Sequence, residues 1–156
     1  MNKTLNFEED FLDFIRLCNK YEVEYLVVGG YAVNVHGYVR YTKDLDVAIA
    51  ISPGNAAQMI KVIDEFGFGS LGLQQKDFMQ KDGVVQLGHA PVRIDILNDV
   101  DGVAFGEAFE KRRDVQYEDV LIHVIGLDEL YVLKQRAGRK QDLADIEKLQ
   151  NRNKQK

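Results

Sequence analysis

Residues 25–51, YLVVGGYAVNVHGYVRYTKDLDVAIAI, decide the expected fold of this chain. A short apolar run stops at Gly29-Gly30, and a second apolar run begins at Asp44 and Asp46, which flank a leucine. Because side chains alternate across a strand, the two aspartates are expected on one face and the apolar side chains on the other. Two neighbouring carboxylates repel each other, and burial raises their pKa values unless a cation lies between them. A divalent metal ion is the simplest cation for this place.

The glycine pair is expected at the turn between a strand and a helix. Residues 23–28 predict a short strand, and the apolar residues after Gly30 predict a helical segment that stops at Gly37. Such a turn exposes backbone N–H groups, and glycines without Cβ atoms let an anion approach closely. A tight turn without a ligand is the simpler interpretation, but the paired aspartates that follow favour a phosphate site.

A basic loop connects the two halves of this stretch. Residues 38–43 bring Arg40, Thr42 and Lys43 to the start of the aspartate strand. Such groups bind phosphate oxygens in many sites, whereas exposed loop cations often have no specific partner. Both interpretations stay open for Arg40 and Lys43.

A third aspartate lies on a later strand. Residues 84–87 and 92–97 predict two strands joined by a turn at 88–91. Asp95 is expected on the opposite face from its apolar neighbours. A single strand aspartate is more often part of a salt bridge than a metal ligand. Three aspartates on two apolar strands, behind a glycine turn, favour a ligand set.

Apolar residues at helical spacing predict helices around these strands. The expected helices cover residues 7–20, 53–66, 105–109, 129–134 and 142–150, and a hairpin covers 114–117 and 120–125. The expected N-caps are Asn6, with Glu9 completing a capping box, Ser52 before Pro53, and Asp128. Residues 67–83 are interrupted by glycines and fit either a mobile loop over a cleft or a plain surface connection.

Length and charge limit the class of protein. The chain has 156 residues, of which 46% are hydrophobic, so we expect one globular domain over residues 1–156. A net charge of -5 argues against a broad basic surface for nucleic acid. No apolar run approaches the roughly 18 residues of a membrane span, and we expect a cytoplasmic protein without membrane contact.

The cysteine and the histidines give weaker signals. Cys18 has apolar neighbours, which fits a buried side chain in a reducing compartment better than a reactive thiol. His36, His89 and His123 are spread along the chain and do not suggest a zinc site.

Taken together, these motifs resemble the nucleotidyltransferases of the DNA polymerase beta superfamily, in their small bacterial form. The resemblance rests on Gly29-Gly30, thirteen intervening residues, Asp44-Leu45-Asp46 and Arg93-Ile94-Asp95-Ile96. Further segments are similar to toxin-like and small antibiotic nucleotidyltransferases: residues 30–33, His36-Gly37, Arg40, Thr42-Lys43, Leu133-Lys134 and residues 139–143. The resemblance covers residues 20 to 150.

The chain also departs from that family at the glycine turn. Many members have Gly-Ser where this chain has Gly29-Gly30, so a hydroxyl that could contact phosphate is missing. Tyr31 follows directly, and its bulk could close the pocket or stack on a base.

The resemblance implies an α/β (α+β) nucleotidyltransferase fold, with a mixed twisted sheet flanked by helices and with C-terminal helices. It also implies transfer of a nucleoside monophosphate from a nucleoside triphosphate, expected to be ATP, to an acceptor hydroxyl. On this basis Asp44 and Asp46 hold two magnesium ions, and Asp95 holds one of them and serves as general base. Gly29 and Gly30 contact the phosphates. Lys134 binds the triphosphate or is a surface lysine.

Three acceptors agree with this resemblance: a small molecule, a tRNA 3′ end, or a hydroxyl of a partner protein in a toxin–antitoxin pair, where the partner is a small helical protein. The alternative from another class is a nucleotide-binding or partner-binding module that has lost turnover, although all three carboxylates are present. A metal-dependent nuclease would also use clustered aspartates, but the glycine turn favours triphosphate binding.

Overall fold

A six-stranded mixed sheet forms the centre of the computed structural model, which describes residues 5–89 and 92–154. The strand order is β3-β4-β2-β1-β6-β5. The strands are β1 (Tyr25–Val28), β2 (Asp44–Ile49), β3 (Val84–His89), β4 (Val92–Asn98), β5 (Arg113–Tyr117) and β6 (Val120–Val124). The central strand β2 pairs antiparallel with β1 and parallel with β4, and β1 pairs parallel with β6. Antiparallel hairpins complete both edges.

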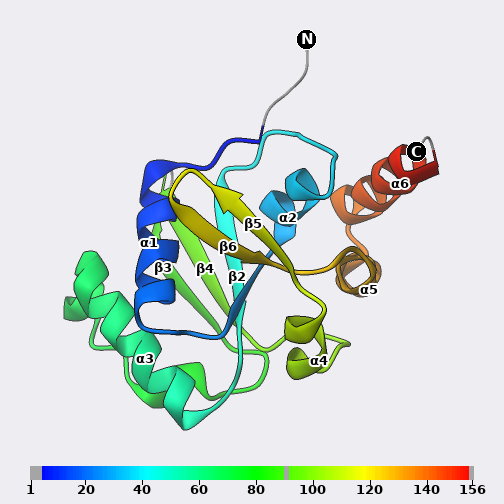
Figure 1. Ribbon diagram of the computed structural model, residues 1–156. Helices are drawn as coiled ribbons and strands as arrows, with labels where there is room; N and C mark the ends of the chain where they lie inside the picture. The colour runs from blue at the N-terminus through cyan, green and yellow to red at the C-terminus, as the bar shows by residue number, and fades with distance from the viewer. Residues whose placement is uncertain (1–4, 90–91, 155–156) are drawn as a thin grey trace.

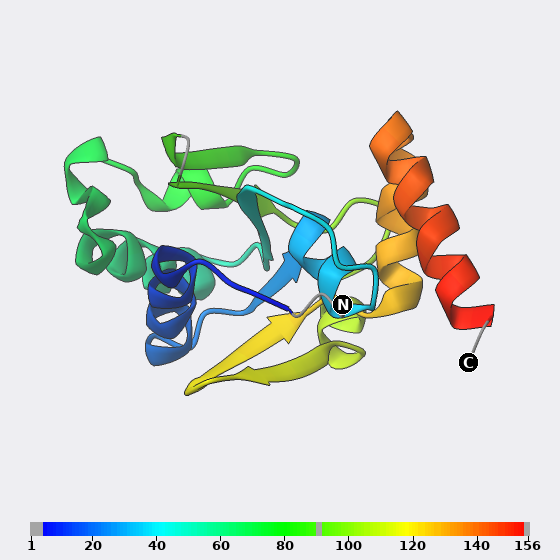
Figure 2. The same cartoon turned by 90° about the horizontal axis from the view of Figure 1, so that it is seen from above.

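Helices cover both faces of this sheet. They are α1 (Glu9–Lys20), α2 (Gly29–Val35), α3 (Pro53–Ile63), α4 (Phe105–Glu110), α5 (Leu127–Ala137) and α6 (Lys140–Lys154). Helices α1 and α3 lie on one side, and α2, α5 and α6 lie on the other, as Figure 1 and Figure 2 show from two directions. The predicted fold class, a mixed sheet flanked by helices with C-terminal helices, is confirmed. In the described part of the chain, no helix is both long and apolar enough to cross a membrane.

The alternation of side chains sets which face of each strand is buried. On β2, Leu45, Val47 and Ile49 are fully buried in the core, whereas Asp44 and Asp46 are only half-buried. Burying such an apolar side chain contributes about 1.5–3 kcal/mol, so the register of β2 is strongly specified and the aspartates are left on the other face. The strand prediction for residues 44–51 is therefore confirmed in its pattern, although β2 ends at Ile49.

Cys18 lies in the core, as its neighbours predicted. Its side chain is completely buried, and burial raises the pKa of the thiol. A thiolate is the nucleophilic form of cysteine, so this environment disfavours a catalytic role.

Two of the expected helix caps are wrong. Helix α1 begins at Glu9, with Glu8 in the N-cap position and no side-chain cap, and the Asn6 side chain instead accepts a hydrogen bond from the Tyr117 hydroxyl at 3.2 Å. Long-range contact with the β5–β6 hairpin has replaced the local capping box. Asp128 lies in the first turn of α5, because this helix begins at Leu127, two residues earlier than expected, with Gly126 in the N-cap position.

The cap at Ser52 is confirmed. Its hydroxyl accepts a hydrogen bond from the Asn55 backbone N–H at 3.1 Å, and Pro53 occupies the first helical position. The expected helix over 53–66 is divided, since α3 ends at Ile63 and a π-helical turn (η1, Asp64–Phe68) follows.

The remaining differences concern connections. Residues 67–83 contain two short 3-10 helices, η2 (Gly69–Leu71) and η3 (Gln75–Phe78), so they are a partly ordered surface connection. Of the expected turn at 88–91, the first two residues belong to β3, and residues 90–91 lie outside the described part. Helix α6 continues to Lys154, beyond its predicted end at 150.

Candidate functional site

The glycine turn lies directly against the aspartate strand and the basic loop. Helix α2 begins at Gly29, immediately after β1, and Gly29 has φ +64°. A Cβ atom at Gly29 would collide with the Asp46 carboxylate, and one at Gly30 would collide with the Thr42 hydroxyl. A side chain at either position would therefore force its neighbour to move, and at Gly29 the positive φ also disfavours any other residue. Thr42 Oγ1 lies where a side chain at residue 30 would project. Helix α2 has only seven residues, so the surrounding cations matter more for anion binding than the helix itself.

The three aspartates lie on one face of two adjacent strands. Asp46 on β2 is paired in register with Asp95 on β4, and Asp44 is paired with Arg93. The pKa of Asp46 is raised to about 6, first because its carboxyl is buried and then because Asp95 and Asp44 carry like charges. Lys134 and Arg93 act in the opposite direction. The expected repulsion between strand carboxylates is therefore present.

Arg93 occupies the place that was expected for a cation beside Asp95. Its guanidinium donates two hydrogen bonds to the two carboxylate oxygens of Asp95, at 3.0 and 2.9 Å. Arg93 Nε also lies 3.9 Å from Asp44 Oδ2. Among residues 5–89 and 92–154, no group of three or more His, Cys, Asp or Glu side chains is arranged to hold a metal ion. The structure thus aligns the three aspartates without joining them into a ligand set, since Asp95 is paired with Arg93.

Lys134 is neither a surface lysine nor a free cation. It is buried between α5 and α6, and its ammonium donates to Asp142 Oδ1 at 3.1 Å and to Asp145 Oδ2 at 3.0 Å. Asp145 also accepts two hydrogen bonds from Arg40, both at 2.9 Å, and one from Gln141 at 2.8 Å. Three donors on separate segments therefore meet one fully buried carboxylate.

The charges of this network hold its two carboxylates in the ionised form. Burial acts to raise the pKa of Asp142 and Asp145, but hydrogen bonds from Arg139 and Lys134 on Asp142, and from Arg40, Lys134 and Gln141 on Asp145, lower both pKa values. Arg139 donates to Asp142 Oδ2 at 2.7 Å while its own side chain stays largely exposed. The resemblance to toxin-like and small antibiotic nucleotidyltransferases included residues 139–143, but it assigned no role to any of them. The i, i+3 spacing of Arg139 and Asp142 was the available signal.

A cavity of about 350 Å³ joins most of the predicted residues. Its lining includes Gly29, Gly30, Arg40, Thr42, Lys43, Asp44, Asp46, Lys134 and Arg139. The lining thus combines three carboxylates, Asp44, Asp46 and Asp142, with four cations, Arg40, Lys43, Lys134 and Arg139. Asp95 lies beside it on β4 rather than in its lining.

Tyr31 is a correction to the expected site. Its ring is buried in the core, stacked on Phe7 at 4.8 Å between ring centroids and edge-on to Phe11 at 5.6 Å. Its ring thus lies among core aromatic side chains and not in the pocket lining. The aromatic side chain that lines the pocket is Tyr41, which is 83% exposed. An exposed tyrosine between Arg40 and Thr42 was the overlooked signal.

The three strand aspartates have the chemistry of a divalent-cation site, although their present arrangement in the described residues does not form one. Asp44, Asp46 and Asp95 supply hard carboxylate oxygens, which magnesium prefers. The raised pKa of Asp46 reflects a concentration of negative charge that a cation would relieve. Such a cation would have to compete with Arg93 for Asp95.

A glycine turn that lies against paired strand aspartates in a mixed sheet is typical of the nucleotidyltransferase fold, and solved structures of that class have a similar fold. A predicted nucleotidyltransferase from Thermotoga maritima has a TM-score of 0.58 at 16% identity, over 91% of each chain. An antigenic nucleotidyltransferase-like protein from Paracoccidioides brasiliensis has a TM-score of 0.51 at 13% identity, over 92% of this chain and 75% of that one. At these identities, the likeness concerns the fold.

The family follows from the sequence itself. Residues 8–156 match the family described as nucleotidyl transferase of unknown function (DUF2204), and the chain belongs to this family. No curated protein sequence matches the chain.

Proposed function

We propose that this chain transfers AMP from ATP to a hydroxyl group, using two magnesium ions held by Asp44, Asp46 and Asp95. The observation that carries this proposal is the pocket in which Asp44 and Asp46 face Arg40, Lys43, Lys134 and Arg139. A nucleoside triphosphate bound to magnesium needs both kinds of groups at once: carboxylates for the metal and cations for the phosphate oxygens. Family membership supports the same class of reaction.

The cations of the pocket lining would bind the triphosphate. Lys43 and Arg139 reach it with exposed or partly exposed side chains, and the Thr42 hydroxyl supplies a hydrogen-bond donor beside Gly30. Lys134 and Arg40 also line the pocket and add positive charge, while both are hydrogen-bonded to Asp145. The close approach of phosphate oxygens to Gly29 and Gly30 is favoured because neither residue has a Cβ atom.

The transfer reaction would take place at the three strand aspartates, Asp44, Asp46 and Asp95. When bound, the two metal ions would stabilise the charge that develops on the attacking and leaving oxygens. The acceptor oxygen forms a bond to the α-phosphorus while the bond from this phosphorus to the bridging oxygen of the β-phosphate breaks. Pyrophosphate leaves, and Asp95 takes the proton of the acceptor hydroxyl. For this step, Asp95 must be released from Arg93.

The acceptor is proposed within a limited set: a small molecule, a tRNA 3′ end, or a hydroxyl of a partner protein, as in a toxin–antitoxin pair with a small helical partner. A net charge of -5 makes extended RNA contact a weaker candidate than an RNA end. The alternative function is binding of nucleotide without turnover. It is favoured by one observation, the engagement of Asp95 by Arg93 in this structure.

The test uses ATP labelled at the α-phosphate, magnesium and a lysate of the source cells. We expect an acceptor that becomes labelled with wild-type protein and stays unlabelled with Asp95→Asn, whereas ATP labelled at the γ-phosphate leaves this same acceptor unlabelled. Asp114→Asn, a strand aspartate on the distant β5, is the matched control and should retain labelling. Tight ATP binding without a labelled acceptor would establish the binding module, and absence of magnesium-dependent ATP binding would refute both functions.

A further inference from the structure

Arg93 lies on the aspartate face of the sheet, because its own strand β4 places it there. It is two residues before Asp95, so both side chains project to the same side of β4. Its cross-strand neighbour on β2 is Asp44, and its neighbour on β3 is Gly88, which has no side chain. The guanidinium therefore has Asp95 as a neighbour along β4 and Asp44 on β2, whereas Gly88 on β3 offers it no side-chain partner.

We propose that Arg93 is a built-in counter-ion of the metal site, which holds Asp95 while no metal is bound and must release it before a divalent cation can use that carboxylate. This inference rests on the proposed function, because it assumes that the aspartates bind metal. It makes Arg93 a positioning residue that sets metal affinity. The affinity of the site for its metal is then a balance between two cations, one in the chain and one in solution.

The geometry supports exchange of Arg93 rather than a permanent pair. Both oxygens of Asp95 accept from the guanidinium, so a metal ion that binds them in this arrangement must compete with these hydrogen bonds and with the positive charge of Arg93. The Arg93 side chain is 39% exposed whereas that of Asp95 is 13% exposed. Arginine can thus turn toward solvent while the carboxylate stays in place. A partly exposed ion pair is weak compared with coordination of a divalent ion, which makes the exchange feasible.

Two contributions to metal affinity need to be separated. Removal of Arg93 would tighten metal binding simply by deleting a positive charge near Asp44 and Asp46. The proposed exchange adds a second contribution, because it frees the oxygens of Asp95. Only the second contribution disappears when Asp95 can no longer bind metal.

A double-mutant cycle on Mn²⁺ binding, measured from the electron paramagnetic resonance signal of free Mn²⁺, separates them. We expect Arg93→Gln to bind Mn²⁺ about tenfold more tightly than wild type, and less than about twofold more tightly in the Asp95→Asn background. Arg93→Lys keeps the charge but loses the forked geometry, and should also bind more tightly than wild type. These measurements need no nucleotide, acceptor or turnover.

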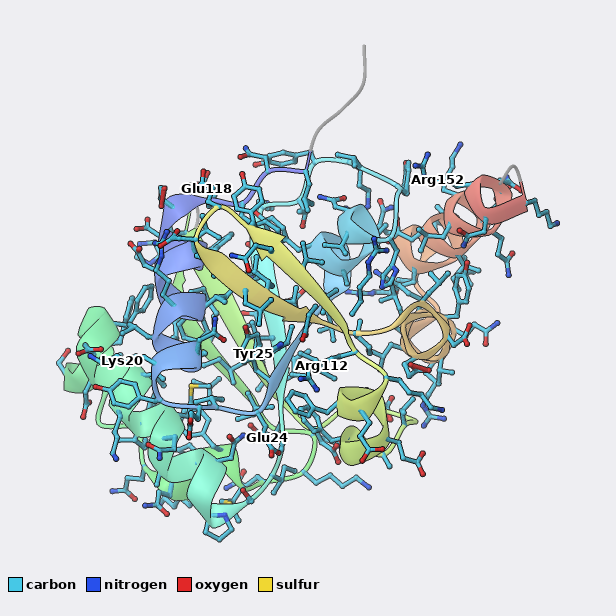
Figure 3. The ribbon with its side chains drawn as sticks, in the orientation of Figure 1. Lys20, Glu24, Tyr25, Arg112, Glu118 and Arg152 are labelled. Carbon is cyan, nitrogen blue, oxygen red and sulfur yellow. The ribbon has the colours of Figure 1, made fainter. Side chains whose placement is uncertain are left out.

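Arg112→Gln is the matched control. Arg112 pairs with Asp114, also two residues later, with Nε to Oδ1 at 3.0 Å. Arg112 directly precedes β5, the edge strand at the opposite end of the sheet from β3 and β4, and Figure 3 labels it near Tyr25. Its substitution should leave Mn²⁺ affinity unchanged.

The outcomes distinguish this inference from the proposed function. If wild type binds Mn²⁺ and Arg93→Gln binds it no more tightly, the exchange is refuted while the metal site stands. Equal tightening in both backgrounds would likewise overturn it, since charge alone would explain the effect. If neither wild type nor Arg93→Gln binds Mn²⁺, the proposed function fails as well.

Discussion

Asp46 is a residue at which stability and the proposed function make opposite requirements. Asp46 contributes nothing to the apolar core, and its carboxylate lies near two others on the same face. Burial and like charge both disfavour its ionised form. A side chain of this kind lowers the stability of the folded chain at neutral pH, and its retention makes sense if it binds a cation.

Asp46→Asn should therefore stabilise the protein in the absence of metal at pH 7. The pKa of Asp46 is raised to about 6 in the folded protein, and lies near 3.9 in an unfolded chain. Since the folded state binds the proton more tightly, the wild type gains stability as the pH falls from 7 through 6 toward 4, and the asparagine variant does not. The expected gain at pH 7 is about 1–2 kcal/mol, and it vanishes near pH 4.

Urea denaturation at both pH values measures this difference. Asp10→Asn, which is exposed on α1, is the control and should change stability by less than about 0.5 kcal/mol. If Asp46→Asn is less stable than wild type at pH 7, the like-charge repulsion described for this site is not significant.

At the level of residues, the sequence predicted positions better than partners. Period-two alternation was enough to place Asp44, Asp46 and Asp95 on one face, because the burial of their apolar neighbours fixes the register. It did not predict the pairing of Arg93 with Asp95, although the same alternation puts both on that face. Pairing depends on which other charges surround them, and those come from distant segments.

At the level of elements, α6 is attached by charge as much as by apolar contact. Ile146 and Leu149 are buried, but Asp142 and Asp145 on the same helix are buried as well. Asp145 links α6 to Arg40, which is 105 residues earlier in the chain. The side chain of Arg152 on α6, labelled in Figure 3, covers Gly37, two residues after the end of α2. The position of α6 therefore depends on the loop that enters β2.

Asp145→Asn should detach α6 from the rest of the fold. It removes the carboxylate that accepts from Arg40, Lys134 and Gln141, and leaves a buried lysine with one carboxylate instead of two. The expected loss of stability is about 3 kcal/mol, because breaking a buried ion pair leaves uncompensated charge.

Hydrogen exchange over residues 140–154 should then accelerate more than exchange in β1. Glu147→Gln, which changes an exposed carboxylate on the same helix, is the matched control and should leave exchange unchanged. Unaltered protection of α6 in Asp145→Asn would show that its apolar contacts suffice.

Element boundaries were less predictable than element types. The helix over 7–20 begins two residues later because Asn6 contacts Tyr117, 111 residues away, and no local pattern reports such a contact. Helix α6 was predicted too short because its last turns are polar. Lys134 was ambiguous between surface and site for a similar reason, since its carboxylate partners lie on the next helix.

At the level of the whole molecule, the candidate site lies between the sheet and the C-terminal helices. Figure 2 shows α1 and α3 on one face of the sheet and α2, α5 and α6 on the other. The cavity is lined from this second side by residues of α2, α5 and α6, and the apolar core includes residues of these helices as well as of α1 and α3. His36 connects these parts near the end of α2, where its Nε2 lies 2.7 Å from the Ile125 carbonyl oxygen. Because a carbonyl only accepts, this nitrogen carries the proton.

The fold should lose stability in mild acid through His36. Burial, aided by the charge of Arg113, lowers the pKa of His36, while its hydrogen bond to Ile125 opposes this effect. The unfolded chain then binds the proton more tightly, so this contribution to stability is complete above about pH 6.5 and decreases as the pH falls toward the folded pKa.

His36→Gln retains an N–H donor and does not titrate. The difference in unfolding free energy between wild type and this variant should change between pH 7.5 and 5.5 in favour of the variant. His89→Gln, an exposed histidine on β3, is the control. A difference independent of pH would mean that His36 is not buried as the structure describes.

The contact between Gly30 and Thr42 has a consequence for redesign of the pocket. A Cβ atom at position 30 would collide with the Thr42 side chain, so a larger residue there requires the threonine to move or to be replaced. A serine at position 30 is therefore expected to fit best together with a smaller side chain at position 42. In this chain, Thr42 already places a hydroxyl beside the glycine turn.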